Sequence, residues 1–379
     1  MIKNIHGGNI YKIARAHGVQ PQDIIDFSAN INPVGLSPKG EAALKEHLSE
    51  IIHYPDPNNE GLLEVTSKTL GISSEQILFG NGAAQLLYAL MELSDLKEVL
   101  VPAPGFSEYA LAAKAQNLKV TSYPLTLVAD PMYHFEMPYE ILRDHLHRAA
   151  ANGERYLLCL GNPNNPDGSL QTVATVLELA QLAATSNSLL LVDESFIEFT
   201  NESHSLRPYI KEYPNLLVLH SLTKFYAIPG LRLGALLGNG ELLARIKQYI
   251  PAWSVNHLAA HYGIGALQDE VYRQKSRAVV AREKEWLYGA IKAFPFLTVC
   301  APSVNFMLLH WQPESPDLGV FMEFLSTKNL LIRSCEAYEG LGTGWFRIAV
   351  KDRTNNELLI SYVKEFAYAH NLFSTSRSD

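Results

Sequence analysis

Short apolar runs separated by polar stretches fill the middle of the chain and predict a buried sheet. Strands are expected at residues 98–102, 119–123, 156–160, 189–193 and 216–220. Helical patterns are expected between them, over residues 106–116 and 170–184. Strands that alternate with helices are typical of a mostly parallel sheet with helices on both faces. Ligands of such sheets bind beyond the carboxyl ends of the strands, so functional residues are expected directly after them.

After residue 255 the pattern changes to that of a smaller α+β domain. A charged helical stretch over 271–294 precedes apolar runs at 306–310, 330–334 and 346–350, and a last helix is expected over 355–369. Glycine and proline interrupt the beginning of the chain, which is typical of an arm rather than a folded unit. The predicted division is an N-terminal arm that packs with the small domain (1–50), a large cofactor-binding domain (51–255) and a small C-terminal domain (256–379).

Composition and charge narrow the classes of partner. The chain has 379 residues, 47% of them hydrophobic and 18% charged, as in an ordinary globular protein with about two domains. A net charge of -8 excludes an overall positive potential of the kind that binds nucleic acid or an anionic membrane. Cys159, Cys300 and Cys335 are too few and too scattered for disulfides or a CxxC metal site, so no metal is expected. With neither an apolar signal segment nor an apolar run of about 20 residues, a cytoplasmic location is expected.

A lysine follows the strand expected at 216–220, in the sequence S-L-T-K of residues 221–224. Most lysines are solvated surface charges, since a buried amine is costly. Burial lowers the pKa of an amine, and a neutral amine is the nucleophile that forms imines with aldehydes. The sequence G-L-R-L-G at 230–234 then places an arginine between glycines, where the backbone can approach a phosphate. The donors to that phosphate would be Ser221, Thr223 and Arg232.

Two further polar residues end neighbouring strands. Asp193 closes the strand expected at 189–193, where an acid can cap a helix, pair with a cation or protonate a pyridine nitrogen. Asn165 lies in the sequence N-P-N-N-P-D-G of residues 162–168, which predicts a rigid turn. Its amide could donate to a phenolate oxygen, although the turn can also be purely structural.

A glycine-rich turn precedes a helical pattern in the sequence F-G-N-G-A-A of residues 79–84. Small residues that open a helix expose backbone N–H groups, and the helix dipole favours an anion there. Such a turn is a weak signal by itself. It lacks the G-K-S/T of a Walker loop and does not match the dinucleotide fingerprint G-x-G-x-x-G.

In this order and spacing, the four motifs resemble those of fold-type I enzymes that use pyridoxal 5'-phosphate (PLP), especially class II aminotransferases. The resemblance covers nearly the whole chain. It implies an α/β fold with a mostly parallel seven-stranded sheet in the large domain and a smaller α+β domain. It also implies PLP as cofactor, Lys224 as the Schiff-base lysine and Asp193 at the pyridine nitrogen. The other implied cofactor contacts are Asn165 at the ring oxygen, Phe106 stacked on the ring, and Gly82, Ala83, Ser221, Thr223 and Arg232 around the phosphate.

The resemblance also implies a substrate contact and a second subunit. Arg347, in W-F-R-I-A at 345–349, matches the arginine that binds the substrate α-carboxylate. Tyr54, in H-Y-P-D at 53–56, matches a tyrosine that reaches the cofactor phosphate of the neighbouring subunit. A homodimer with composite sites is therefore expected.

Within this group the chain looks more like the L-threonine-O-3-phosphate decarboxylases than the histidinol-phosphate aminotransferases. The similarity rests on five stretches: H-G-G-N at 6–9, D-F-S-A-N-I-N-P at 26–33, S-L-T-K-F-Y-A-I-P-G-L-R-L-G at 221–234, W-S-V-N at 253–256 and I-R-S-C at 332–335. The decarboxylase pattern implies that the substrate is bound by His6, Gly7, Asn30, Asn165, Arg333 and Arg347. Taken singly, Arg333 can also be a surface residue and His6 an ordinary residue of the arm.

Two positions depart from the aminotransferase pattern. Phe196 stands where aminotransferases usually carry tyrosine, and the decarboxylases also have phenylalanine there. Asp167 stands where the turn commonly reads N-P-T-G, and the expectation is only that of aspartate in a surface turn.

The resemblance predicts PLP-dependent decarboxylation of a small phosphorylated amino acid. The expected reaction converts O-phospho-L-threonine to 1-aminopropan-2-ol O-phosphate for the cobalamin nucleotide loop. O-phospho-L-serine, which gives ethanolamine phosphate, stays open because one methyl group changes binding by only about 1–3 kcal/mol. Histidinol-phosphate aminotransferase, which shares the cofactor and fold, is the other alternative.

Overall fold

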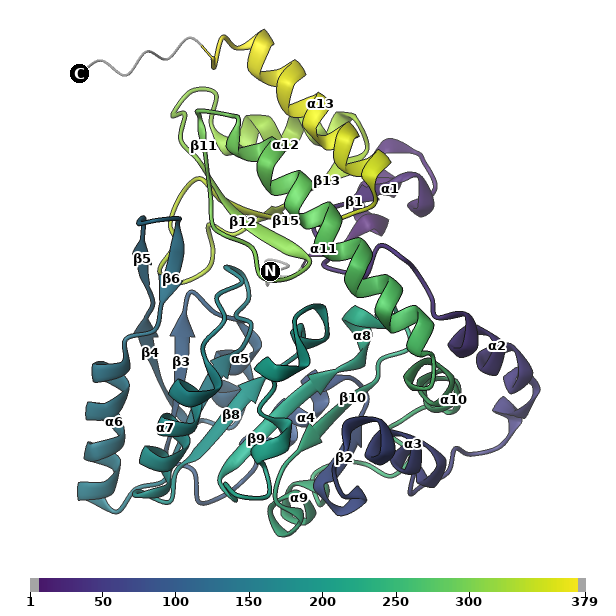
Figure 1. Ribbon diagram of the computed structural model, residues 1–379, viewed down its shortest axis with the longest axis vertical. Coiled ribbons are helices and arrows are strands. Elements are labelled where there is room, and N and C mark those ends of the chain that lie inside the picture. The colour runs from purple at the N-terminus through teal and green to yellow at the C-terminus, as the bar shows by residue number, and fades with distance from the viewer. Residues whose placement is uncertain (1–6, 374–379) are drawn as a thin grey trace.

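The computed structural model of the chain describes residues 7–373. A larger part is built on a seven-stranded sheet and a smaller part on a four-stranded sheet, one above the other in Figure 1. Two-stranded pairings complete the structure: β1 (Ile25–Asp26) with β13 (Leu330–Leu331), and β5 (Thr126–Val128) with β6 (His134–Glu136). The predicted class, a mostly parallel α/β sheet with a smaller α+β part, is confirmed.

The seven-stranded sheet contains all five strands that are predicted between residues 98 and 220. Its neighbouring strands are parallel except for β10, which runs antiparallel to β2 and β9. The apolar pattern does not locate β2 and β10, which are only four residues long and contain glycine. In spatial order the strands are β2 (Ile77–Gly80), β10 (Gly234–Leu237), β9 (Leu216–Ser221), β8 (Leu189–Asp193), β7 (Tyr156–Gly161), β3 (Glu98–Ala103) and β4 (Lys119–Pro124).

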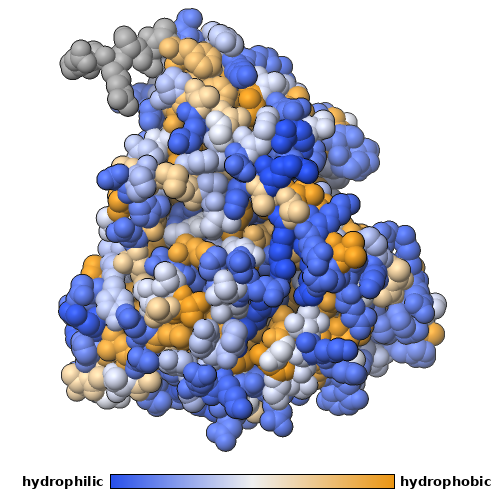
Figure 2. Space-filling view, in the orientation of Figure 1, coloured by the Kyte–Doolittle hydropathy of each residue, from blue (hydrophilic) through white to orange (hydrophobic). Residues whose placement is uncertain are grey.

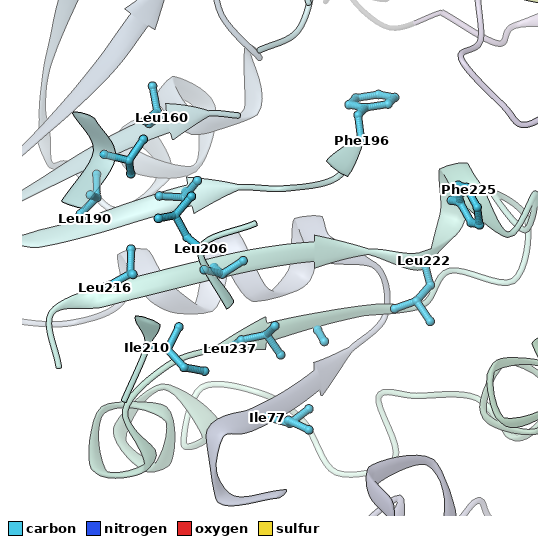
Figure 3. Close-up of a cluster of buried hydrophobic side chains, with 14 of the residues drawn as sticks. Ile77, Leu160, Leu190, Phe196, Leu206, Ile210, Leu216, Leu222, Phe225 and Leu237 are labelled. Carbon is cyan, nitrogen blue, oxygen red and sulfur yellow. The ribbon is translucent and has the colours of Figure 1, made fainter. Parts of the chain in front are cut away.

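Both faces of this sheet are covered because side chains alternate along each strand. In β8, Leu189 and Leu191 belong to one core cluster, while Leu190 and Val192 belong to the other. Figure 3 shows side chains of the second cluster on successive strands. Burial of each such side chain contributes about 1.5–3 kcal/mol. One face packs against α4 (Ala83–Met91), α5 (Glu108–Ala115) and α9 (Gly240–Lys247), and the other against α6 (Tyr139–Asn152), α7 (Val173–Ala184) and α10 (His257–Leu267).

The four-stranded sheet is antiparallel and packs against three helices (Figure 1). Trp311 and Phe321 stack in its core with ring centroids 4.7 Å apart. The strands, in spatial order, are β11 (Leu297–Val299), β12 (Phe306–Trp311), β15 (Trp345–Ala349) and β14 (Arg333–Ser334). The helices are α11 (Glu270–Lys292), α12 (Leu318–Thr327) and α13 (Arg353–Ala369).

The single strand predicted at 330–334 is wrong in one respect, because the structure divides it between two sheets. Leu330–Leu331 pairs with Ile25–Asp26, whereas Arg333–Ser334 pairs with β15. Ile332 lies between the two pairings and is buried. The apolar run continues through the change of partner, so hydrophobicity alone does not reveal it.

The N-terminal segment contacts both parts of the molecule. Its strand β1 joins the small part through β13, and its helix α2 packs along α10. Ser37 fixes that second contact, since its N–H donates to Tyr262 Oη at 2.8 Å and its hydroxyl to Asp269 at 2.8 Å. The predicted division at residues 50 and 255 stays a prediction. The helices of this segment and its continuation are α1 (Ile10–His17), α2 (Pro38–Glu46), η2 (Leu48–Ile52) and α3 (Glu60–Leu70).

The remaining helices are short. They are η1 (Pro21–Asp23), η3 (Ser74–Gln76), η4 (Ile197–Phe199), η5 (Glu202–His204), η6 (Arg207–Tyr209) and α8 (Leu222–Phe225). None of the helices within residues 7–373 is long and apolar enough to cross a bilayer. On the face shown in Figure 2, hydrophobic side chains lie scattered among hydrophilic ones.

Candidate active site

A cavity of about 450 Å³ lies at the carboxyl ends of β7, β8 and β9, where the sheet type predicts a ligand. This volume is typical of a small-molecule site. The structure brings nine of the predicted site residues together in its wall: Gly7, Asn30, Phe106, Asn165, Asp193, Lys224, Arg232, Arg333 and Arg347. The wall also contains residues that the sequence did not single out, among them Ser28, Glu108, Tyr109, Ser195 and Tyr338.

Lys224 is placed by the turn from β9 into the short helix α8. Ser221 caps this helix by accepting a hydrogen bond from Thr223 N–H at 3.4 Å. Burial, together with the nearby cations Arg347 and Arg232, lowers the pKa of the Lys224 amine to about 8, against the opposing effect of Asp193. Near neutral pH, Lys224 is therefore a much better nucleophile than a solvated lysine.

Asp193 is the last residue of β8, and two donors hold its carboxylate. Tyr109 Oη donates to one oxygen at 2.8 Å, and Ser195 N–H donates to the other at 2.9 Å. Burial raises the pKa of Asp193, while these hydrogen bonds and Lys224 act to lower it. Asp193 and Lys224 both line the cavity, so this held carboxylate is available as a partner for a cationic ring nitrogen.

Backbone geometry shapes a cradle beside Arg232. The backbone of Arg232 has φ 62°, a left-handed conformation that a non-glycine residue adopts only at a cost. An added Cβ at Gly82 would lie 2.6 Å from Arg232 Nη2, and one at Gly234 would clash with Ala83 N. Helix α4 begins directly after Gly82 and has no side-chain cap, so its N–H groups are available to an anion.

Four of the predicted phosphate contacts lie around this cradle rather than in the cavity wall. Gly82 and Ala83 open α4 next to Arg232 and Gly234, as the clashes above show. The hydroxyls of Ser221 and Thr223 are 2.8 Å apart and buried, at the strand end that pairs with Gly234. The set of donors fits a phosphate group.

Two arginines face each other across the strands β14 and β15. Arg333 and Arg347 are direct partners in the antiparallel register, so their side chains share one face. Arg347 donates to Asn165 Oδ1 and, at 3.0 Å, to Ser28 O. Within residues 7–373 neither arginine forms an ion pair, and Arg347 Nε and the buried Asn30 Oδ1 have no hydrogen-bond partner. Two guanidinium groups in one cavity, with no carboxylate partner in the part of the chain that the structure describes, indicate an anionic ligand.

The N-terminal segment closes one side of the cavity. Gly8 N–H donates to Ser28 Oγ at 2.8 Å. A Cβ at Gly7 would clash with Ser28 O, so only glycine allows the chain to run this close. Asn32 N–H donates to Lys224 O at 3.1 Å, which ties the same segment to the lysine helix. His6, also predicted as a substrate contact, lies outside the described residues.

Tyr54 is not brought together with the other predicted residues. Its side chain is 79% exposed and stacks on Trp253, with ring centroids 4.7 Å apart. It does not line the cavity of its own chain. An exposed position is what a contact between Tyr54 and a neighbouring subunit would require.

The two departures from the aminotransferase pattern have different outcomes. Phe196 lines the cavity and packs edge-on against Phe306, with centroids 4.9 Å apart, so no hydroxyl is present at this position. The expectation of a surface residue at Asp167 is wrong, because its side chain is only 3% exposed. Asp167 accepts hydrogen bonds from Asn164 Nδ2 and, at 3.0 Å, from Ser169 N–H, and so fixes the turn that presents Asn165.

Comparison with known proteins agrees with this geometry. A family model described as aminotransferase class I and II matches residues 22–363. The chain belongs to this family. The predicted resemblance to fold-type I enzymes, with their fold and PLP cofactor, is thereby confirmed.

Three relatives of this aminotransferase-family chain are informative. A threonine-phosphate decarboxylase of Salmonella typhimurium is 33% identical over 365 residues, which cover 96% of this chain and 97% of that protein. An adenosylcobalamin biosynthesis bifunctional protein of Leptospira interrogans is 32% identical over 96% of this chain and 41% of its own length. The crystal structure of a histidinol-phosphate aminotransferase from Clostridium acetobutylicum superimposes with a TM-score of 0.83 at 27% identity, covering 91% of this chain and all of that one.

Tyr109 is the most consequential site residue of this aminotransferase-family member that sequence reasoning missed. It lies on α5 and is fully buried, so in the sequence it reads as an ordinary core residue of an apolar helix. The available signal was its spacing of three residues from Phe106 within the helix expected over 106–116, since residues at this spacing share a helix face. In the structure α5 begins only at Glu108, and the two rings meet edge to face with centroids 5.5 Å apart. Ser28 lies in the stretch D-F-S-A-N-I-N-P of residues 26–33, which implies no role for it, and Tyr338 lies in a loop with no motif.

Proposed function

We propose that this chain is a PLP-dependent decarboxylase of O-phospho-L-threonine, forming 1-aminopropan-2-ol O-phosphate for cobalamin assembly. The observation that carries the proposal is the pair Arg333 and Arg347, two guanidinium groups in one cavity that form no ion pair with any residue from 7 to 373. The substrate has two anionic ends, a carboxylate and a phosphate, and two such groups match them. The similarity to the Salmonella decarboxylase and to the Leptospira cobalamin protein supports the same reading.

The residues present fit PLP. Lys224 supplies an amine of lowered pKa, Asp193 an oriented carboxylate, and the cradle at Gly82 and Arg232 a place for the phosphate. When bound, PLP supplies an electron sink for the pair released as a bond to the substrate Cα breaks. Phe106 would lie against the ring, and Asn165 beside its oxygen.

The arginines would decide which bond lies in position to break. One guanidinium holds the carboxylate and the other the phosphate, with Asn30 and the backbone at Gly7 closing the cavity around them. Each charge-assisted hydrogen bond contributes about 1.5–3 kcal/mol. Two fixed ends leave the substrate one orientation about its Cα–N bond, which is a positioning effect. Lys224, with its lowered pKa, is then placed to deliver a proton to Cα after carbon dioxide leaves.

Phe196 favours decarboxylation over transamination among the alternatives. Aminotransferases of this group usually carry a tyrosine there, and in this chain the position holds a ring packed on Phe306 without a hydroxyl. O-phospho-L-serine remains the alternative substrate, because one methyl group changes binding by only about 1–3 kcal/mol.

A homodimer is part of the proposal. Exposed apolar side chains cluster along η2 and the segment that follows it, and Trp253 stacks on the last of them. Apolar groups in such number are typical of an interface, and dimers of a single chain are usually symmetric. The cluster consists of Leu48, Ile51, Ile52, Tyr54 and Trp253. The cytoplasm is the proposed location, since the three cysteines are free thiols.

The reaction is tested directly with two substrate mixtures. O-phospho-L-threonine alone should release carbon dioxide, and histidinol phosphate with 2-oxoglutarate should form no glutamate above background. The reverse result would establish the aminotransferase instead. O-phospho-L-serine in the same assay ranks the two phosphoamino acids by kcat/KM.

The role of Lys224 is tested by substitution. Lys224→Ala should lose the near-visible absorbance band of the Schiff base between the lysine and PLP and lower kcat by roughly 100- to 10,000-fold, since the nucleophile and proton donor is gone. Lys284→Ala is the matched control, because Lys284 also has a pKa lowered by burial but donates to Ser303 O at 2.8 Å. A retained absorbance band in Lys224→Ala would exclude the assignment.

The anion-binding role of Arg333 is tested by comparing substrates. Arg333→Ala should raise KM for O-phospho-L-threonine by roughly 10- to 100-fold, the equivalent of one or two charge-assisted hydrogen bonds. KM for unphosphorylated L-threonine should change far less. Arg143→Ala, at an exposed ion pair with Glu140, is the control. Equal effects on the two substrates would contradict a phosphate contact.

A further inference from the structure

We propose that His47, Glu50, His257 and His261 form a binding site for a divalent transition-metal ion of the zinc class, where α2 and η2 meet α10. This site is separate from the PLP cavity, because none of the four residues lines that cavity. It goes beyond the proposed decarboxylation and does not depend on it.

The fold brings the four side chains together from two segments. His257 and His261 are four residues apart on α10, so both imidazoles lie on one face of this helix. His47 is the C-cap of α2 and Glu50 lies in η2. Because α2 packs along α10, the short turn between α2 and η2 carries His47 and Glu50 over that face.

The distances are close to those that a metal ion requires. Glu50 lies between two histidines, with its oxygens 3.0 Å from His47 Nδ1 and 3.2 Å from His257 Nε2. The rings of His47 and His261 are stacked 3.6 Å apart, and those of His257 and His261 lie 4.4 Å apart. One possible ligand atom from each residue lies within 4.8 Å of all the others.

Modest side-chain rotation would complete a coordination sphere. Bonds of about 2.0–2.1 Å from zinc to imidazole nitrogen place tetrahedral ligand atoms roughly 3.3–3.4 Å apart. Glu50 already lies 3.0 and 3.2 Å from nitrogens of His47 and His257, and no two of the four ligand atoms are more than 4.8 Å apart. The Glu50 side chain is 46% exposed and so has room to turn, while the two α10 histidines are held on one helix face.

The cluster holds more imidazoles than one carboxylate can pair. Glu50 contacts His47 and His257, and the third ring belongs to His261. A neutral imidazole offers the lone pair of one ring nitrogen to a metal ion. Across residues 7–373, His261 makes no hydrogen bond that would occupy this lone pair. A metal ion would take up the lone pairs of all three rings.

The ligand set selects the class of ion. Imidazole nitrogen suits zinc, copper and nickel, whereas magnesium and calcium require mainly oxygen ligands. Three histidines and one glutamate supply the four ligands of a tetrahedral zinc ion. An ion here would tie α2 and η2 to α10, directly beside the exposed Leu48 and Ile51 of the proposed dimer surface.

The test measures zinc binding to the full-length holoenzyme without a histidine tag. Protein stripped with a chelator is titrated with Zn²⁺ calorimetrically, and the metal content is determined after dialysis. About one zinc ion per chain is expected. His261→Gln and His257→Gln should weaken binding by at least about 100-fold, since loss of an outer-shell partner alone costs 10- to 100-fold. A double variant of two α6 histidines, the half-buried His145 and the exposed His147, should bind zinc like the parent (His145→Gln with His147→Gln).

A further variant and a spectroscopic readout distinguish loss of a zinc ligand from misfolding of the protein. Glu50→Gln changes an exposed side chain and should weaken zinc binding with little risk to folding. Co²⁺ in the site should give the intense visible absorption of a four-coordinate ion, and His261→Gln should lose it. No zinc retained by the parent protein, or equal affinity in His261→Gln, would overturn the proposal. Decarboxylation by the zinc-free enzyme reports on the proposed function separately, since the PLP cavity contains none of these residues.

Discussion

Tyr109 acts on the carboxylate of Asp193 from inside the protein core. The 2.8 Å hydrogen bond between them reaches Asp193 from α5, while Ser195 supplies the second donor from the loop after β8. Both bonds favour the charged form of the carboxyl group and oppose the rise in its pKa that burial causes. Tyr109 is thus a positioning residue for the acid that would face the ring nitrogen of PLP.

Tyr109→Phe should therefore impair the reaction without preventing substrate binding. Loss of a hydrogen bond to a charged group removes about 1.5–3 kcal/mol, so kcat should fall by roughly 10- to 100-fold while KM changes little. Because this bond lowers the pKa of Asp193, its removal raises that pKa, and the acid limb of the pH–kcat profile should move to higher pH. Steady-state kinetics over a range of pH values measures both effects.

Tyr123→Phe is the matched control for this substitution. Tyr123 is also fully buried, and its hydroxyl donates to Cys159 O at 2.7 Å, away from Asp193. Its loss should lower stability but leave the acid limb in place. The same shift of the acid limb in both variants would contradict a specific role for Tyr109.

Site residues whose type and motif indicate a chemical role could be predicted from the sequence. Site residues whose role depends on how distant segments pack could not. Lys224 and Asn165 follow predicted strands, and Asp193 ends one. Parallel strands bring their carboxyl ends to one edge of the sheet, so these residues are expected to lie close together. Tyr109 reads as core, and Asp167 reads as a surface turn because its burial depends on the distant Ser303 loop that packs over Gly168. The histidine cluster was equally hidden, since 207 positions separate Glu50 from His257. The expectation of no metal considered only the spacing of cysteines.

At the scale of elements, alanine substitutions at two nearby glycines, Gly230 and Gly234, should have different effects on PLP binding. Gly234 begins β10 against the first turn of α4, where an added Cβ would meet Ala83 N. Gly234→Ala should push α4 away from the cradle and weaken PLP binding by roughly 10- to 100-fold, the value of one or two phosphate contacts. Titration of the apoenzyme with PLP, followed by absorbance, measures the change.

Gly230→Ala tests whether this effect is local. Gly230 has nothing within 4 Å of an added Cβ and no positive φ, so alanine fits there without strain. PLP affinity should stay within about twofold of the parent, since an exposed substitution without strain changes little. A similar loss in both variants would mean that loop flexibility, and not the contact with α4, sets the affinity.

The long apolar strands could be predicted as elements, and the short or divided ones could not. The strand at 189–193 has the predicted bounds, because a fully buried parallel strand is a continuous apolar run. β2 and β10 escape prediction because four residues are too few to show a period. The division of 330–334 between two sheets depends on the N-terminal strand β1, which no local pattern can reveal.

For the whole molecule, the exposed apolar cluster along η2 makes the dimer testable. Ile52 is 80% exposed, and the proposed interface would bury it on both subunits. Ile52→Asp should weaken dimerisation by at least about 100-fold, since two buried isoleucines contribute about 1.5–3 kcal/mol each and two charges would replace them. Analytical ultracentrifugation at several concentrations measures the dissociation constant. Activity should fall with the dimer, because Tyr54 would no longer reach its partner's site.

Val320→Asp is the control for this substitution. Val320 is a partly exposed residue of α12, on the small part of the molecule and outside the η2 cluster. The association state should not change in this variant. A monomeric parent protein with full activity would contradict the composite site.

The parallel pairing of β1 with β13 has a consequence for synthesis on the ribosome. Ile25 pairs with Leu330, so the early strand waits for a partner made about 300 residues later. At roughly 5–20 residues per second this delay lasts about 15–60 seconds. Phe27 is fully buried in the finished protein, but the other buried residues of its core cluster are not yet synthesised when it emerges. A nascent chain that stalls before Arg347 could already hold its large sheet, yet it would lack one of the two arginines proposed to bind the anionic ends of the substrate.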